Sequence, residues 1–243
     1  MTRRCRYGTA VALLLMCRPA SGLWALTPNE ILDKLDQAQQ KTKTLSGEME
    51  ENVAVRGTLQ SQSLSGRLIW ENPNKIFLQF DKPTPETFVC DGKTLWIYLP
   101  ALNQAMRQDM NSSELLKQFQ FQLGAEVRDM RERFAITPAG EETLDGSLCH
   151  ILKLVPRRSV KSKSYFEVKL WISEALWLPV KSMAYTINGT VVSMRLKKLK
   201  TNPAVKEELF TFHPPAGVEV IDGFLMMAPS PASEALTKGK TKK

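Results

Sequence analysis

The stretch from Lys75 to Leu99 reads KIFLQFDKPTPETFVCDGKTLWIYL, and its pattern indicates the fold class. Apolar residues alternate with other residues at both ends of the stretch, and successive side chains of a strand point to opposite faces of a sheet. Asp91-Gly92 lies between the two alternating runs and is the strongest short signal for a β-hairpin. The residues predicted to share the inward face are Ile76, Leu78, Phe80, Leu95, Ile97 and Leu99.

The same reasoning extends to the segments on either side. Arg67 is charged and is placed toward solvent, so Leu68 and Trp70 are predicted to point inward. Further strand-like runs cover residues 134–137, 149–155, 165–172, 178–187, 191–200 and 218–221, and Asn188-Gly189 forms a two-residue hairpin turn. About ten antiparallel strands with few helices predict a mainly β protein of the α+β type, with one strongly curved sheet or barrel.

Two helices are predicted to accompany the strands. The first begins after Thr27, which forms a capping box with Glu30, and it ends near Thr42; Gly47 then marks the turn to the next element. The second begins with the capping box of residues 111–114 and ends at Gly124. Its apolar residues include Leu115, Leu116 and Phe119. A curved sheet has a concave face that such helices can cover either tightly, as a core, or loosely, as a cavity, and the sequence leaves both alternatives open.

Both ends of the chain are predicted to lie outside the folded body. Residues 1–25 combine a basic start, a short apolar run and small-residue cleavage sites after Gly22 and Ala25, which is typical of a secretory signal peptide. Residues 224–243 are rich in Ala, Pro, Ser, Lys and Gly, which predicts a disordered basic tail. Together these ends carry all but about one of the eight net positive charges of the chain, so the basic composition does not indicate nucleic-acid binding.

No pattern of residues points to catalysis or to a cofactor. The chain has no G-x-S-x-G elbow, no P-loop and no G-x-G-x-x-G, and its two histidines, His150 and His213, stand without an orienting motif. Glu141-Glu142 is interpreted as a solvated pair in a turn. The acids of residues 109–132 lack metal-ligand spacing. We therefore expect a protein that is not an enzyme and that holds neither a metal nor a cofactor.

Cys90 and Cys149 are the only cysteines after residue 25. Both are predicted to lie on strands, and export would place them in an oxidising compartment. A disulfide requires Cα atoms within about 7 Å of each other, which a sequence does not reveal. A Cys90–Cys149 disulfide and two buried thiols therefore remain alternatives.

Several motifs together resemble the LolA family of periplasmic lipoprotein carriers. They are SGRL at residues 65–68, NPNK at 72–75, DGKTLWIY at 91–98, Pro100, Gln104 and FTFHPPAGVEVI at 210–221. The likeness covers nearly all of residues 26–222. It implies an unclosed antiparallel β-barrel over residues 26–223, with a helical lid over an apolar cavity. The residues implied to line this cavity are Leu68, Trp70, Ile76, Leu78, Phe80, Leu95 and Ile97, and those implied on the lid are Leu115, Leu116 and Phe119.

The resemblance also implies a function. Such carriers take acylated lipoproteins from an inner-membrane lipoprotein-releasing transporter and hand them to an outer-membrane receptor, which places this chain in the periplasm as a monomer. Many members carry an Arg before the turn proline that controls the lid, whereas this chain has Asn72, which cannot form the charge-assisted bonds of a guanidinium. Two other functions stay open: a membrane-anchored, LolB-like acceptor, which requires acylation of Cys17, and a sensor domain on the same fold.

Overall fold

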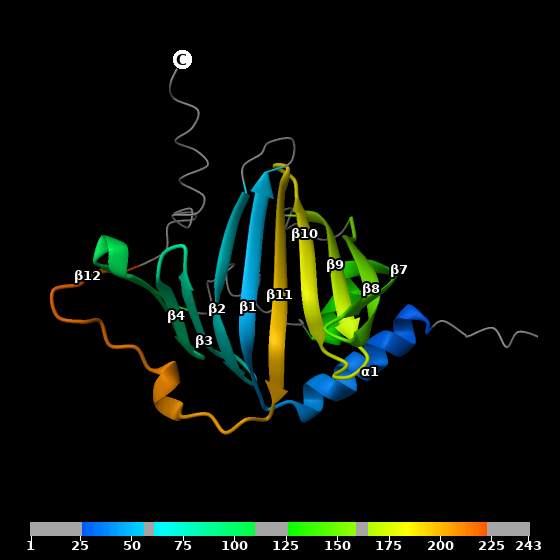
Figure 1. Ribbon diagram of the computed structural model, residues 1–243, viewed down its shortest axis with the longest axis horizontal. Helices are drawn as coiled ribbons and strands as arrows, with labels where there is room; N and C mark the ends of the chain where they lie inside the picture. Colours follow the sequence, from blue (N-terminus) through cyan, green and yellow to red (C-terminus); the bar gives the residue numbers. More distant parts are fainter. Residues whose placement is uncertain (1–25, 56–60, 110–125, 159–164, 223–243) are drawn as a thin grey trace, which may run out of the picture.

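The computed structural model describes residues 26–55, 61–109, 126–158 and 165–222. They form one sheet in the strand order β12-β6-β5-β4-β3-β2-β1-β11-β10-β9-β8-β7. Figure 1 shows these strands side by side, with β1 and β11 at the centre. The strands are β1 (Thr44–Val55), β2 (Ser61–Glu71), β3 (Lys75–Lys82), β4 (Glu86–Asp91), β5 (Thr94–Leu99), β6 (Gln104–Asp109), β7 (Phe134–Leu144), β8 (Ser147–Pro156), β9 (Tyr165–Ser173), β10 (Pro179–Thr186), β11 (Thr190–Thr201) and β12 (Glu219–Asp222).

The predicted mainly β architecture is confirmed. The sheet is curved and unclosed, because its end strands β12 and β7 are not paired with each other. Antiparallel pairing holds throughout except at one edge, where β12 runs parallel to β6. This exception arises because residues 202–218 cross the sheet before β12 adds to its edge, whereas the other neighbours are joined mostly by short turns.

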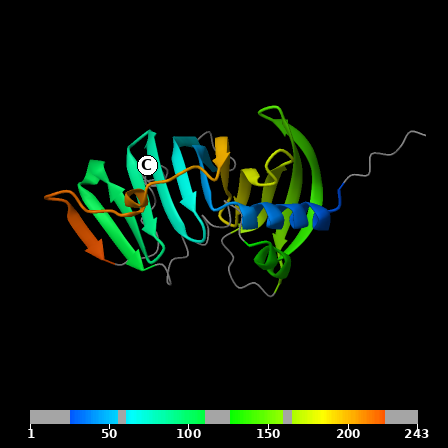
Figure 2. The ribbon, with the colours of Figure 1, turned by 90° about the horizontal axis from the view of Figure 1, so that it is seen from below.

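Helix α1 (Pro28–Lys41) has the predicted start and end. The hydroxyl of Thr27 accepts a hydrogen bond from the backbone N–H of Glu30, whose carboxylate accepts one from the backbone N–H of Thr27 at 2.7 Å. This reciprocal cap satisfies two N–H groups that a helix start leaves unpaired. The helix is capped at its other end by Thr42. Its buried residues pack on the half of the sheet formed by β7–β10, and Figure 2 shows the helix lying across these strands.

Helix α3 (Val127–Arg133) was not predicted from the sequence. Five of its seven residues are charged, so only Val127 and Met130 mark an apolar side at helical spacing. Both are buried against the same cluster as α1. The guanidinium of Arg131 also pairs with the carboxylate of Asp33 on α1 at 2.6 Å, so the two helices cover one half of the sheet together.

Gly47 does not mark a turn, contrary to the prediction. It lies inside β1, at a shift of register between Ser46 and Glu48. A Cβ atom on Gly47 would come within 2.9 Å of the backbone oxygen of Lys197 on β11. The glycine therefore permits a close approach of two strands rather than a reversal of the chain.

The two faces of the sheet are covered differently. The inner face, defined here as the face that carries α1 and α3, holds two apolar clusters, one beneath the helices and one on β1–β5 and β11. Trp70 and Leu199 contact both clusters and join them. On the outer face, residues of the segment that follows β11 pack on β2–β5 through the 3-10 helix η3 (Glu207–Phe210), where Phe210 is buried.

Candidate binding face

The residues predicted to face inward from β2, β3 and β5 lie together on the inner face. Six of the seven implied cavity residues are buried, and Trp70 is partly buried beside them. Their neighbours Ile69, Phe77 and Trp96 belong to a cluster on the outer face, so the predicted alternation is confirmed. Whether the inward residues contact a lipid stays a prediction. The buried six are Leu68, Ile76, Leu78, Phe80, Leu95 and Ile97.

Strand register turns these residues into continuous apolar rows, which we call the inner plate. One row runs from Leu68 through Leu78 and Phe88 to Ile97. A second row runs from Trp70 through Ile76 and Cys90 to Leu95. Cross-strand neighbours of this kind lie about 5 Å apart, so the rows form an unbroken apolar surface several side chains wide.

Two carboxylates interrupt the inner plate, and the sequence reasoning missed both. Glu86 pairs in register with Phe80 and is only 4% exposed. Glu51 is half-buried on β1, in register with the buried Leu64. Burial raises the pKa of Glu86. Burial and, second, the Glu86 carboxylate raise the pKa of Glu51 to about 7. Alternation could have located Glu86 on the inner face, because it lies two residues before Phe88 and residues two apart in a strand share a face.

Of the residues predicted to form or control the lid, only Asn72 lies in the part of the chain that the structure describes. Leu115, Leu116 and Phe119 lie outside the described residues, as do the predicted signal peptide and the whole of the predicted tail. Asn72 is described and is exposed in the turn between β2 and β3. Its backbone N–H donates to the carbonyl of Lys43 at 2.8 Å, so the turn is held against the connection between α1 and β1. Control of a lid from this position stays a prediction.

Of the two alternatives for the cysteines, the structure contains the pair of thiols. Cys90 and Cys149 are both buried and are not joined in a disulfide. Cys90 lies with the inner plate on β4, whereas Cys149 lies on β8 in an outer-face cluster, seven strands away. That is about 34 Å along the sheet, far beyond the reach of a disulfide. Burial raises the pKa of Cys90 to about 11 and also raises that of Cys149, so both are poor nucleophiles.

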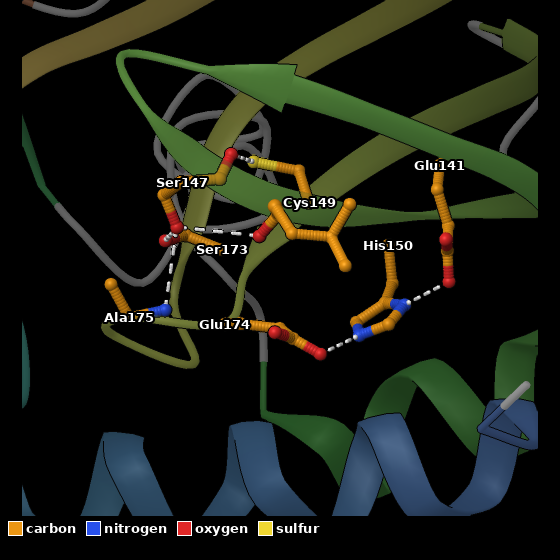
Figure 3. A network of polar contacts seen from close by, with 8 residues as sticks. Glu141, Ser147, Cys149, His150, Ser173, Glu174 and Ala175 are labelled. Carbon is orange, nitrogen blue, oxygen red and sulfur yellow. Dashed lines mark hydrogen bonds and ion pairs between the residues drawn. The ribbon is translucent and has the colours of Figure 1, made fainter. Parts of the chain in front are cut away.

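Glu141 and Glu142 do not lie in a turn, contrary to the interpretation of the sequence, although both side chains keep contact with solvent. Both lie in β7, which extends seven residues beyond the predicted end at Thr137. His150 is 5% exposed, and its ring nitrogens contact the carboxylates of Glu141 at 3.1 Å and Glu174 at 2.9 Å, as Figure 3 shows. The Glu142 carboxylate accepts from the indole N–H of Trp171 at 2.5 Å. This network joins the buried ring of His150 to carboxylates at the surface and ties β7, β8 and β9 together.

The motifs that carry the family resemblance meet in space on the outer face. Phe212, from the FTFHPP segment, packs against Trp96 and Tyr98 from the DGKTLWIY segment at ring-centroid distances of 5.4 and 5.5 Å. The amide of Asn74 in the NPNK turn donates to the carbonyl of Gly92 at 3.0 Å. These motifs therefore hold the outer layer and the hairpins in place, and they also contribute Leu68, Leu95 and Ile97 to the inner plate.

The part of the chain that the structure describes contains no helix that combines the length and the hydropathy needed to cross a bilayer. An unclosed curved sheet with an apolar inner face, partly covered by helices, defines the class of half-barrel proteins.

The chain belongs to the LolA family, because the model of the family described as "Outer membrane lipoprotein carrier protein LolA" matches residues 40–213. Carriers of this family are binding proteins rather than enzymes.

Individual relatives are more distant. An uncharacterized protein of Methanocaldococcus jannaschii is 26% identical over 201 residues, which cover 83% of this chain but only 56% of that relative. An outer-membrane lipoprotein carrier protein of Dechloromonas aromatica is 27% identical over 192 residues, covering 78% of this chain and 86% of the relative. Among solved structures, an uncharacterized conserved protein from Thermus thermophilus shares the fold, with a TM-score of 0.53, 16% identity, and coverage of 80% of this chain and 98% of that one.

Proposed function

We propose that this protein is a periplasmic carrier that binds the acyl chains of lipoproteins on the inner plate and conveys them from an inner-membrane transporter to an outer-membrane receptor. The observation that supports this most directly is the inner plate itself, since its rows of apolar side chains run across four neighbouring strands of an unclosed sheet. Membership of the LolA family supports the same class of ligand.

The physical requirement for such a carrier is simple. Each buried methylene group of an acyl chain gains about 0.8 kcal/mol, so a diacylated protein does not leave a membrane for water without a replacement surface. The carrier must also release the chains, which favours a surface that can be uncovered over a sealed core. An unclosed sheet is compatible with both requirements, because its end strands β12 and β7 are not paired with each other.

The proposal includes export and control of access. Residues 1–25 would direct the chain to the periplasm and be removed. The segment that contains Leu115, Leu116 and Phe119 would cover the inner plate, and the turn at Asn72 would influence how firmly it closes. Asn72→Arg should then favour the closed, empty protein and reduce uptake of a hydrophobic dye. Unchanged uptake would show that access is not controlled from this turn.

Photocrosslinking tests the proposed site without altering the fold. A lipopeptide with a photoreactive group in its acyl chain should label β2–β5 through inward residues such as Leu78, and peptide mass spectrometry should locate the label. The adjacent Phe77 points to the outer face and serves as an internal control on the same strand. Labelling of outer-face residues, or no labelling above that of a water-soluble probe, would contradict the proposal.

Two variants on one strand give a second test. Leu78→Ser should weaken binding of the lipopeptide, because Leu78 is fully buried in the inner plate. Phe77→Ser removes a comparable apolar side chain from the outer face and should leave binding unchanged in the molecules that remain folded. Equal losses in the two variants, at matched folded fractions, would refute the assignment of the inner face.

A further inference from the structure

We propose that Glu86 and Glu51 form a polar subsite of the inner plate that binds an ammonium group of the ligand, so that the preferred cargo is a diacylated lipopeptide with a free N-terminal amine. This inference rests on the proposed function and specifies the ligand further. It starts from an anomaly: the face suited to acyl chains contains two carboxylates, and no cationic side chain of the described residues pairs with either of them.

Glu86 presents the anomaly most sharply. It pairs in register with Phe80, and Phe88 and Cys90 follow it at alternate positions of β4, so it lies on the apolar face. Its exposed fraction is 4%. No hydrogen bond or ion pair from the described part of the chain reaches its carboxylate, and burial alone accounts for its raised pKa. A carboxylate set among apolar side chains is costly to maintain, and a cation of the ligand would offset this cost.

Glu51 supplies a second carboxylate at the same end of the sheet. Its register partners are Leu64 on β2 and Met194 on β11, which are both buried in the same cluster. Glu51 lies near the end of β1, and Glu86 begins β4; Figure 1 shows these strand ends on the side away from α1. The charge of Glu86 acts on Glu51, so the two groups lie within electrostatic range of each other.

An ammonium group resolves the anomaly better than a metal ion does. One ammonium group can donate up to three hydrogen bonds, so it can bond to both carboxyl groups and offset one negative charge while its acyl chains remain on the apolar rows. A hard metal ion needs about six oxygen ligands. Within the described residues, no group of three or more His, Cys, Asp or Glu is placed to hold a metal. The chemistry therefore favours a ligand in which an amine and acyl chains are attached to the same residue, as in a diacylated lipopeptide.

The decisive experiment compares two synthetic lipopeptides that differ only at the amine. Both carry the same diacylglyceryl cysteine and the same uncharged peptide; one has a free α-amine and the other an acetyl group, which removes the charge without adding a long chain. Displacement of a fluorescent fatty acid at pH 7 measures both affinities. We expect the free amine to bind about tenfold more tightly, as two charge-assisted hydrogen bonds allow.

Substitutions assign this preference to the two carboxylates. Glu86→Gln and Glu51→Gln should each reduce it, and the double variant should abolish it while still binding the acetylated peptide. Glu48→Gln is the matched control, because Glu48 lies on β1 in an exposed ion pair with Lys198 at 2.7 Å. This variant should retain the full preference.

The possible outcomes separate the two proposals. Equal affinities for both lipopeptides, or a preference that survives in the double variant, would overturn the ammonium subsite and leave the carrier function standing. Binding of neither lipopeptide would overturn both. A second readout needs no ligand: the empty Glu86→Gln protein should melt at or above the temperature of the wild type, because it no longer buries an unpaired charge. A lower melting temperature would mean that Glu86 has a structural role and would overturn the subsite.

Discussion

Raising the pH should destabilise this protein through Glu51, and Glu51→Gln should remove the contribution of this residue. The pKa of this carboxyl is about 7 in the folded protein, mainly because of burial, against 4.5 as its ordinary value. Between these two values the folded protein binds more protons than the unfolded chain. The stability linked to protonated Glu51 is therefore fully present below the lower pKa and is lost as the pH rises through the higher one.

The magnitude follows from the two pKa values. About 7 and 4.5 differ by about 2.5, and each pKa unit corresponds to about 1.4 kcal/mol of unfolding free energy. The total loss is therefore about 3.5 kcal/mol, most of it between the two pKa values, from about pH 4.5 to about pH 7. For a domain of this size, that loss should lower the melting temperature by about 7–14 °C. Glu86 adds to the loss in the same direction, because burial raises its pKa as well.

Urea unfolding of the wild type and of Glu51→Gln across this pH range measures the effect. The variant should gain stability relative to the wild type as the pH rises. Glu30→Gln provides a control of opposite sign, because the hydrogen bonds from Thr27 lower the pKa of Glu30. Its stabilising contribution is present at neutral pH and disappears in acid, where wild type and variant should converge. Parallel pH profiles for the wild type and Glu51→Gln would refute the burial of an uncompensated carboxyl at this position.

Three further predictions concern the fold itself. Gly66→Ala should destabilise the protein severely and lower its folded yield, because a Cβ atom would lie 2.0 Å from the carbonyl oxygen of Gln79; a melting temperature equal to that of the wild type would contradict this. Phe210→Ala should cost about 3–5 kcal/mol in urea unfolding, since Phe210 is 2% exposed beneath the outer layer, and a loss below about 1 kcal/mol would show that the outer layer is not anchored there. Reductant should leave the melting temperature unchanged, because Cys90 and Cys149 are not joined, and a drop on reduction would disprove their separation.

Prediction from the sequence succeeded where the physical signal is local. Thr27 and Glu30 form the predicted cap because they lie one helical turn apart, and their hydrogen bonds need no other part of the fold. Leu68, Leu78 and Ile97 face inward as predicted, because alternation along a strand depends only on the strand itself. The family motifs added the unclosed barrel, which alternation alone could not distinguish from a closed one.

Prediction failed where a residue takes its role from a distant partner. Glu141 was placed in a turn because nothing in its own segment shows that it pairs with β8 beside His150. Gly47 was taken for a turn because its neighbour on β11 is 150 residues further along the chain. Glu86 and Glu51 escaped notice for the same reason, since each is an ordinary acid until the register places it among apolar side chains.

The amino-acid order was thus sufficient to establish which segments form strands, which side of each strand is apolar, and where α1 begins. These properties arise from interactions within a few residues. The tertiary structure was required to show that β1 pairs with β11, that the cysteines lie on opposite faces, and that two carboxylates enter the inner plate. These properties depend on contacts between residues far apart in the chain. The free energy of such a contact depends on both segments together and cannot be inferred from either one alone.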